Sequence, residues 1–265
     1  MAILKFTILG CGSSGGVPRI GGNWGDCDPS NPKNRRRRCS LMIQRQNKVG
    51  ETRVLIDTSP DLREQLLDIG VGVLDAVVYT HPHADHVNGL DDLRMVFINQ
   101  GKRVAIWADQ NTTDALVNRF RYAFTQPEGS DYPPILDPRL IDGTFVIDGG
   151  GGQIEITPFP VKHGEIIALG FRIGPVAYSP DVSAMLEVSW EAVNGAQCWI
   201  VDALRRRPHP SHSHLERTLD WVSKAKPEKA ILTNMHNDLD YQTVMKETPA
   251  NVHPAFDGMS LIFEM

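Results

Sequence analysis

Three histidines and an aspartate fall within six residues, directly after a short run of apolar and β-branched residues. The run covers residues 76–80, and the polar side chains follow as His81, His83, Asp85 and His86. Such a set is costly to bury in an apolar core, and the imidazoles would repel one another if they were charged. Neutral imidazole and carboxylate are instead the ligands that zinc and similar ions accept. The spacing therefore predicts a metal-binding loop at the end of a strand, which requires a β-sheet to support it.

Three single donors follow later apolar runs, each in a segment that reads as a turn. They are His163 in PVKHGE, Asp181 in AYSPDVS and His236 in LTNMHND. Each one alone is typical of an ordinary turn residue. Together with the first cluster they give seven donors, enough for two ions with open coordination positions. We expect two divalent metal ions, zinc or manganese, because both accept histidine and carboxylate ligands.

Short apolar and β-branched runs recur along the 265-residue chain and predict many strands, whereas apolar residues at helical spacing predict fewer helices. The predicted strands are 3–9, 39–45, 53–57, 74–80, 103–107, 144–147, 153–157, 168–173, 175–179, 197–202, 228–233 and 259–264. The predicted helices are 60–69, 109–124, 183–193 and 213–225. This pattern favours an α/β fold with packed sheets, in a single domain over residues 1–265.

The first predicted strand runs into a glycine-rich segment, residues 10–15, with the spacing G-x-G-x-x-G. A dinucleotide-binding fingerprint needs a helix directly after the glycines, so that the helix N-terminus meets the pyrophosphate. Residues 17–22 read VPRIGG and have no helical period, which excludes that fold. We expect instead a loop poor in side chains whose amides approach a substrate phosphate, with Ser13 and Ser14 as substrate contacts.

The set and order of the donor motifs resembles the metallo-β-lactamase fold superfamily, whose pattern is H-x-H-x-D-H followed by a single His, Asp and His. The resemblance covers nearly the whole chain and implies a four-layer αββα sandwich with metals at one edge of its two sheets. It implies a first ion bound by His81, His83 and His163, and a second bound by Asp85, His86 and His236, with Asp181 bridging both. Asp57 matches the superfamily's early aspartate, which supports the metal loop without binding an ion.

The segment RRRPHPSHSHLERTLDW, residues 205–221, adds three histidines at the start of a predicted helix. Ser213 and Glu216 have the spacing of a capping box, which places the N-cap at Ser213. We expect His209 and His214 to be surface residues in this turn, and their roles stay open.

A second level of resemblance concerns one branch of the superfamily, which contains tRNase Z and the phosphoribosyl cyclic phosphodiesterases. HSHLERTL, TNMHNDLDY and GCGSSGGVP are similar to motifs of this branch. Members of this branch place a histidine just before the corresponding helix, near the leaving group of their substrate. The resemblance implies that His212 is a catalytic residue that also contacts the substrate.

The resemblance implies a dinuclear metal-dependent hydrolase, favouring a phosphodiesterase that cleaves a small cyclic or nucleotide-like phosphate ester with a metal-bound hydroxide. Asp85 would bind one ion and orient that hydroxide, and His212 would serve the leaving oxygen. Two alternatives stay open, because a fold does not fix a substrate. One is a thioester or lactam hydrolase on the same fold, and the other is a non-catalytic metal-dependent nucleotide-binding protein.

The net charge and the lengths of the apolar runs limit the partners that this chain can bind. The formal net charge of −5 argues against a broad basic face for long nucleic acid, so we expect a small phosphate ester or nucleotide. No run approaches the roughly 18 apolar residues of a membrane span. We therefore expect a cytoplasmic protein without membrane contact, and a homodimer stays open.

Two further features of the N-terminal region have no settled role. Cys27 and Cys39 lack C-x-x-C spacing and are more typical of unlinked thiols, although a structural metal stays open. The superfamily's cyclic phosphodiesterase branch has a cysteine-rich zinc site there, and this chain departs from it. We expect the run Arg35–Arg38 to be a solvated loop, with phosphate binding as the alternative.

Overall fold

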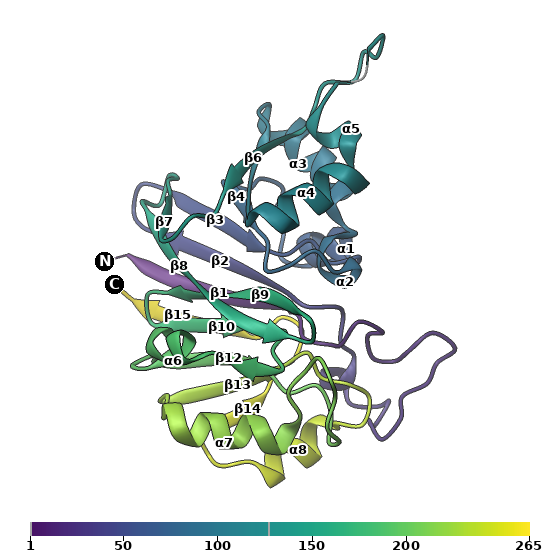
Figure 1. The fold of residues 1–265 in the computed structure, drawn as a ribbon, viewed down its shortest axis with the longest axis vertical. Coiled ribbons are helices and arrows are strands. Elements are labelled where there is room, and N and C mark those ends of the chain that lie inside the picture. Colours follow the sequence, from purple (N-terminus) through teal and green to yellow (C-terminus); the bar gives the residue numbers. More distant parts are fainter. Residues whose placement is uncertain (1, 127) are drawn as a thin grey trace. The chain divides into compact units, whose positions relative to one another are not determined.

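Two mixed β-sheets carry the fold in the computed structural model, which describes residues 2–126 and 128–265 (Figure 1). Most strands of each sheet lie in one compact unit, and each unit collects segments that are distant in the sequence. The first unit contains the chain up to Thr7 together with residues 40–155 and 260–265, and the second contains residues 8–39 and 156–259. The chain therefore passes repeatedly from one unit to the other.

The sheet of the first unit has the strand order β15-β1-β2-β3-β4-β5-β6. Its strands are β1 (Ile3–Gly10), β2 (Ser40–Gln46), β3 (Glu51–Ile56), β4 (Ala76–Val78), β5 (Val104–Ala108), β6 (Leu136–Leu140) and β15 (Ser260–Glu264). The strands from β3 to β6 are parallel, whereas β2 runs antiparallel to β3 and β15 antiparallel to β1. Residues 54–56 and 76–78 are continuous apolar runs that are completely buried, as is typical of parallel strands.

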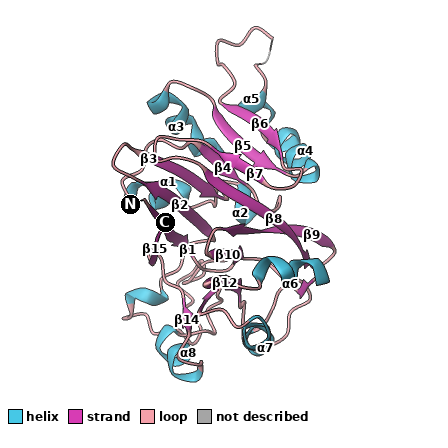
Figure 2. Cartoon of the chain, turned by 90° about the vertical axis from the view of Figure 1, so that its left-hand side faces the viewer, coloured by secondary structure: helices cyan, strands magenta, loops and turns pink. Residues whose placement is uncertain are grey.

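Helices in the first unit make the crossovers that parallel strands require. They are α1 (Leu62–Asp68), α2 (Ala84–Val87), α3 (Leu93–Gln100), α4 (Gln110–Arg119) and α5 (Arg121–Phe124), and a 3₁₀ turn covers Leu90–Asp92. Helix α3 lies against β5, and α4 and α5 lie against β6 (Figure 2). A further short strand, β7 (Phe145–Ile147), contributes Phe145, whose ring stacks on Trp107 of β5 at 4.5 Å between centroids.

The sheet of the second unit has the strand order β11-β8-β9-β10-β12-β13-β14. Its strands are β8 (Ile154–His163), β9 (Ile166–Ile173), β10 (Val176–Ser179), β11 (Ala184–Met185), β12 (Cys198–Asp202), β13 (Lys229–Thr233) and β14 (Val252–Pro254). The strands β10, β12, β13 and β14 are parallel, and the others pair antiparallel. Its helices are α6 (Glu187–Val193), α7 (Leu215–Ala225) and α8 (Tyr241–Glu247), with a 3₁₀ turn at Pro32–Asn34.

Tryptophan side chains fix α6 and α7 on the second sheet. Trp199 of β12 is completely buried, and its indole Nε1 donates to Ser179 Oγ at 3.0 Å. Trp190 of α6 meets Trp199 and Trp221 of α7 edge-on, at 6.3 Å and 6.5 Å between ring centroids. Edge-to-face aromatic pairs at these separations are favourable. The three rings therefore hold both helices against β12.

The predicted elements agree with the structure in most positions, but no predicted element covers β6, β14, α2, α3 or α8, and three predicted elements differ from the structure in extent. The range 109–124 is not one helix, because Phe120 (φ −122°, ψ 37°) leaves the helical region between α4 and α5. Helix α6 begins at Glu187 and not at residue 183, since Ala184–Met185 form β11. Strand β8 extends to His163 although it contains two prolines, which lack an N–H. Its pairing with β11 avoids both prolines, since it involves only Val161 and Lys162.

The predicted cap of α7 is wrong by one residue. His214 is the N-cap (φ −108°, ψ 163°), and the helix begins at Leu215. The Ser213 hydroxyl does not cap the helix. It lies 2.8 Å from Thr218 Oγ1, whose own proton goes to the carbonyl of Asp202 at 2.6 Å. The amide of Leu215 donates instead to the carbonyl of Arg205 at 3.0 Å, so a backbone group takes the place of the side-chain cap.

None of the helices in the described ranges has the length and apolar character that a bilayer crossing requires.

Ser59 and Leu62 leave no room for a side chain at Gly89, which follows the metal loop predicted at residues 81–86. A Cβ added there would lie 2.0 Å from the carbonyl oxygen of Ser59. The close approach lets the amide of Gly89 donate to Thr58 O at 2.9 Å, and the amide of Thr58 donate to His86 O at 2.8 Å. The backbone around Thr58 therefore holds the loop from both sides.

We predict that Gly89→Ala lowers the free energy of unfolding by about 1–3 kcal/mol or more, because the added methyl group forces the two backbone segments apart. Urea denaturation followed by circular dichroism measures the change. Gly15→Ala is the matched control, since a Cβ there meets nothing closer than the Arg19 side chain at 3.6 Å. Equal stability of both variants would contradict the close packing at Gly89.

Candidate metal centre

The candidate residues of each unit lie where parallel strands end. In the first unit, Asp57 follows β3 and His81 comes three residues after β4. In the second unit, Asp181 follows β10 and His236 follows β13. The carboxyl ends of parallel strands meet at one edge of a sheet, where α/β proteins bind their ligands. Each unit therefore gathers its polar residues at one edge of its own sheet.

Asp57 is the centre of the hydrogen bonds in the first unit. It is completely buried and has a left-handed backbone (φ 62°). Its Oδ1 accepts from the amide of Thr80 at 2.8 Å, and its Oδ2 accepts from Thr80 Oγ1 at 2.8 Å and from His86 Nδ1 at 2.7 Å. Burial raises the pKa of the Asp57 carboxyl, and the adjoining His86 and Thr80 lower it. Asp57 therefore supports the loop 80–86 through hydrogen bonds.

These bonds also fix the tautomers of two histidines. Thr80 Oγ1 donates to Asp57, so at 2.8 Å it accepts from His81 Nδ1. His86 Nδ1 donates directly to Asp57. In both rings the proton is therefore on Nδ1, which leaves the lone pair on Nε2 as a possible metal ligand.

The four donors of the loop form two pairs. His81 Nε2 lies 3.0 Å from His83 Nδ1, and His86 Nε2 lies 3.6 Å from Asp85 Oδ2. His81 and His86 are completely buried, whereas Asp85 is half-buried and His83 exposed. Each pair presents two ligand atoms toward a common point.

The second unit brings His163, Asp181 and His212 together, with one ligand atom from each lying within 4.8 Å of the others. His163 Nδ1 donates to the carbonyl of Ser211 at 2.6 Å, and its Nε2 lies 3.6 Å from Asp181 Oδ2. The Nε2 lone pair of His163 is therefore directed toward the carboxylate. Asn234, the residue after β13, donates to Asp181 Oδ1 at 3.2 Å and fixes that side chain.

Asp202 is a further candidate residue of the site, which the sequence analysis missed. It ends β12 and is completely buried, and its Oδ2 accepts from His212 Nδ1 at 2.8 Å and from the amide of Val182 at 3.0 Å. Burial raises the pKa of the Asp202 carboxyl, and the adjoining His212 offsets part of this rise. The only signal in the sequence is an aspartate at the end of the predicted strand 197–202. Its pairing with His212 depends on tertiary structure.

His236 has charged neighbours of both signs. Its Nε2 contacts the guanidinium of Arg19, and its Nδ1 lies 3.6 Å from Asp238 Oδ1. Its amide donates to the carbonyl of Leu204 at 2.8 Å, which ties the turn to the chain after β12. Arg19 would have to withdraw for Nε2 to bind an ion, and it belongs to a turn in which Gly21 and Gly22 have positive φ.

The glycine-rich loop lies beside the segment that carries His236. The amide of Ser13 donates to Met235 O at 3.2 Å, and the amide of Met235 donates to Cys11 O at 2.8 Å. Ser13 is buried and Ser14 is exposed. A Cβ on Gly12 would lie 2.9 Å from that of Arg36, so this glycine serves a close approach of backbone segments.

Several side chains with open roles have definite positions. His209 is half-buried, and its ring lies 5.2 Å from that of His212. His214 is buried, so its expected surface position is wrong. Cys27 lies 3.8 Å from the Arg36 guanidinium, whereas Cys39 lies 3.6 Å from Gly12 O. Among the described residues, neither thiol belongs to a group of three metal-binding donors.

The donors present in each unit fit a divalent ion. The rings of His81, His86 and His163 each have Nδ1 bonded to an oxygen acceptor, which is how metal-binding histidines are usually oriented. Carboxylates of Asp85 and Asp181 lie beside these rings at 3.6 Å. Imidazole with carboxylate is the ligand chemistry of zinc and of related ions.

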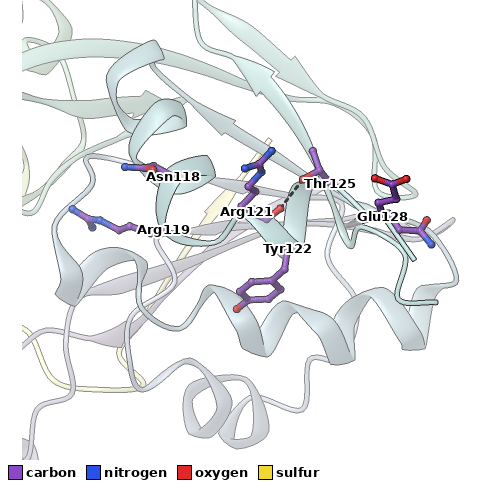
Figure 3. A pocket seen from close by; sticks show the side chains of 7 residues that line it. Asn118, Arg119, Arg121, Tyr122, Thr125 and Glu128 are labelled. Atoms are coloured by element: carbon purple, nitrogen blue, oxygen red, sulfur yellow. Dashed lines mark hydrogen bonds between the residues drawn. The ribbon is translucent and has the colours of Figure 1, made fainter. Parts of the chain in front are cut away.

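A hollow of about 620 Å³ lies on the first unit and includes none of the predicted site residues (Figure 3). It is lined by the end of α4, α5 and the loop after it: Asn118, Arg119, Arg121, Tyr122, Thr125, Gln126 and Glu128. Thr125 Oγ1 donates to the carbonyl of Arg121 at 3.1 Å. Arg119 also donates to Pro82 O at 2.5 Å, which links α4 to the metal loop.

Residues 52–235 match the family described as the beta-lactamase superfamily domain. A structure described as a new diphosphatase from the PhnP family is 36% identical, with a TM-score of 0.87, and the match covers 99% of this chain and 98% of that one.

Two curated proteins are also similar. An octanoyltransferase of Porphyromonas gingivalis is 31% identical over 265 residues, which is 98% of this chain and 52% of that protein. A ribonuclease Z of Bradyrhizobium diazoefficiens is 32% identical over 147 residues, which is 53% of this chain and 45% of that protein. The chain thus spans about half the length of the curated relatives it matches.

We predict that Asp57→Asn weakens divalent metal binding about ten- to a hundredfold, because the amide places a donor against one of the three groups that donate to Asp57. Competition with a chromogenic chelator measures the affinity. Asp137→Asn, at an exposed carboxylate paired with Arg139, is the control. Unchanged affinity in a folded Asp57→Asn protein would remove Asp57 from its role.

Proposed function

The chain belongs to the beta-lactamase superfamily, and we propose that it is a divalent metal-dependent phosphodiesterase acting on a small phosphate ester. The family match and the similarity to the diphosphatase over nearly the whole chain confirm the predicted αββα fold class. They also confirm the branch of phosphodiesterases and tRNase Z-like proteins. The extent of the domain over residues 1–265 and the cytoplasmic location stay predictions.

The observation that carries the proposal is the hydrogen bond between Asp202 and His212, beside the donors His163 and Asp181. Ion-binding donors alone suit many hydrolases, including those of thioesters and lactams. A histidine oriented by a buried carboxylate adds a group that can protonate a leaving oxygen. Phosphate esters with poor alcohol leaving groups need such an acid.

We assign the donors to two ions as the family's order of motifs implies. The first ion would be held by His81, His83 and His163 and the second by Asp85, His86 and His236, while Asp181 would bridge them. Divalent ions in such a centre lower the pKa of a coordinated water toward neutrality and polarise a phosphoryl oxygen. Asp85 would also orient the attacking water, and Asp57 would hold the imidazoles of His81 and His86 in place.

His212 would act as the general acid. Its Nδ1 proton is held by Asp202 Oδ2, so protonation at Nε2 gives an imidazolium that the buried carboxylate stabilises. The proton on Nε2 would pass to the oxygen of the departing alcohol.

The substrate would be small and anionic. The 36% identity to a diphosphatase supports a phosphodiester or a phosphoric anhydride as the bond that is cleaved. Arg19 and the amides of the loop around Ser13 and Ser14 would bind phosphoryl oxygens, since Arg19 is a cation beside His236. The net charge of −5 favours a small substrate over long nucleic acid. A homodimer also stays a prediction.

We predict that the purified protein hydrolyses small phosphodiesters, and that a chelator abolishes this activity until zinc or manganese is restored. The test combines metal analysis with a panel of cyclic ribose phosphates, linear phosphodiesters, a dinucleoside diphosphate and a precursor tRNA. An octanoyl thioester and a β-lactam serve as comparison substrates. Turnover of a thioester or lactam alone would overturn the proposal, and tight nucleotide binding without any turnover would indicate a binding protein.

We predict that His212→Ala lowers kcat about 10²- to 10⁴-fold for an alkyl phosphodiester, because the leaving alkoxide loses its proton donor. Asp202→Asn is expected to lower kcat as well, because the imidazolium of His212 loses its counter-charge. For a nitrophenyl ester, whose leaving group needs no proton, kcat is expected to fall far less in both variants.

His209→Ala is the matched control, since its ring neighbours that of His212. Equal losses for both esters would contradict the acid role.

A further inference from the structure

Arg36 is a completely enclosed cation in a run of four arginines. Its side chain is 2% exposed, whereas Arg35 is exposed and Arg37 and Arg38 are half-buried. The expectation of a solvated loop over residues 35–38 is therefore wrong at Arg36. Burying a guanidinium costs free energy unless acceptors satisfy its donors. The identity of these acceptors indicates what the residue does.

The acceptors of Arg36 lie in the turn that carries His236. Nη1 donates to the carbonyl of His236 at 3.2 Å, and Nη2 donates to the carbonyl of Leu239 at 2.7 Å. Nη2 also lies 3.3 Å from Asn34 Oδ1, and Nη1 lies 3.8 Å from Cys27 Sγ. The planar guanidinium thus spans both ends of the turn 236–239.

The surrounding loop reinforces the same turn. Asn34 Oδ1 accepts from the amide of Tyr241 at 2.8 Å, and Asn34 Nδ2 donates to Asp240 Oδ2 at 2.6 Å. The amide of Asp26 donates to the carbonyl of Asn237 at 2.8 Å. Residues 26–36 therefore hold residues 236–241 through backbone groups and buried amide side chains, with Arg36 at the middle of these contacts.

We propose that Arg36 is a positioning residue for His236, fixing the backbone of its turn so that the imidazole can bind an ion. This inference rests on the proposed role of His236 as a metal ligand. The carbonyls of His236 and Leu239 accept from different nitrogens of one guanidinium, so a planar cation with several donors binds both. An apolar residue of similar length would fill the volume but leave both carbonyls without these donors.

The proposal gives the loop 27–39 a function that does not depend on its cysteines. Cys27 and Cys39 have different polar neighbours, Arg36 for the first and Gly12 with Thr233 for the second. The hydrogen bonds of one guanidinium join the loop to the turn.

The test measures metal affinity in Arg36→Met, His236→Ala and the double variant, by competition with a chromogenic chelator. Arg36→Met is expected to lower the affinity for the second of two bound ions about ten- to a hundredfold, as is typical when a residue that orients a metal ligand is lost. Arg35→Met, at the exposed neighbour, is expected to match the unaltered protein. The double variant is expected to lose no more than His236→Ala alone, because Arg36 acts through His236.

Arg36→Lys keeps the charge but cannot reach both carbonyls, so an intermediate affinity is expected. Losses that multiply in the double variant would overturn the proposal, because Arg36 would then act independently of His236. Unchanged affinity in Arg36→Met would overturn it as well.

Hydrogen exchange in the metal-free protein separates this inference from the proposed function. Arg36→Met is expected to speed exchange of the amides of residues 235–241 about tenfold, since two hydrogen bonds to the turn are lost. Arg35→Met is expected to leave it unchanged. If the unaltered protein binds no second ion, the metal assignment fails. Unchanged exchange in Arg36→Met would instead refute the positioning of the turn.

Discussion

The carboxylate of Asp57 is the constraint on which the metal loop of the first unit depends. One buried side chain at the end of β3 accepts three hydrogen bonds from the segment after β4. Because β3 and β4 are adjacent parallel strands, their carboxyl ends bring these residues together. The strained left-handed backbone of Asp57 directs its side chain into this position. The orientations of His81 and His86 follow from it.

The second unit uses the same physical device with a different result. Asp202 ends a parallel strand, is buried, and orients a histidine through Nδ1, as Asp57 does. The imidazole that it holds is not one of the family's metal-binding set, which is why we assign it to proton transfer. The two carboxylates support the two halves of the proposed chemistry, ion binding and protonation of the leaving oxygen.

Residue spacing predicted the metal loop because its donors are close in sequence and follow a recognisable strand. It also predicted most strands and the exclusion of a dinucleotide site. It failed at α2, which is too short to show a period, and at the extent of β8, where prolines resemble a strand end. Arg36 was expected to be solvated, since a run of four arginines gives no sign that one guanidinium meets carbonyls 200 residues later.

The sequence by itself determined the chemical type of the site, because imidazole and carboxylate in this order have few other uses. It also determined the family, because the motifs that identify the family can be recognised without knowing any contact. Only the tertiary structure decided which groups orient those donors. The bonds from Asp202 to His212, from Ser211 to His163 and from Arg36 to the turn of His236 join residues whose separation in the chain has no periodic signature. They form only in the folded chain, where loops that are distant in the sequence pack against the ends of β8, β12 and β13.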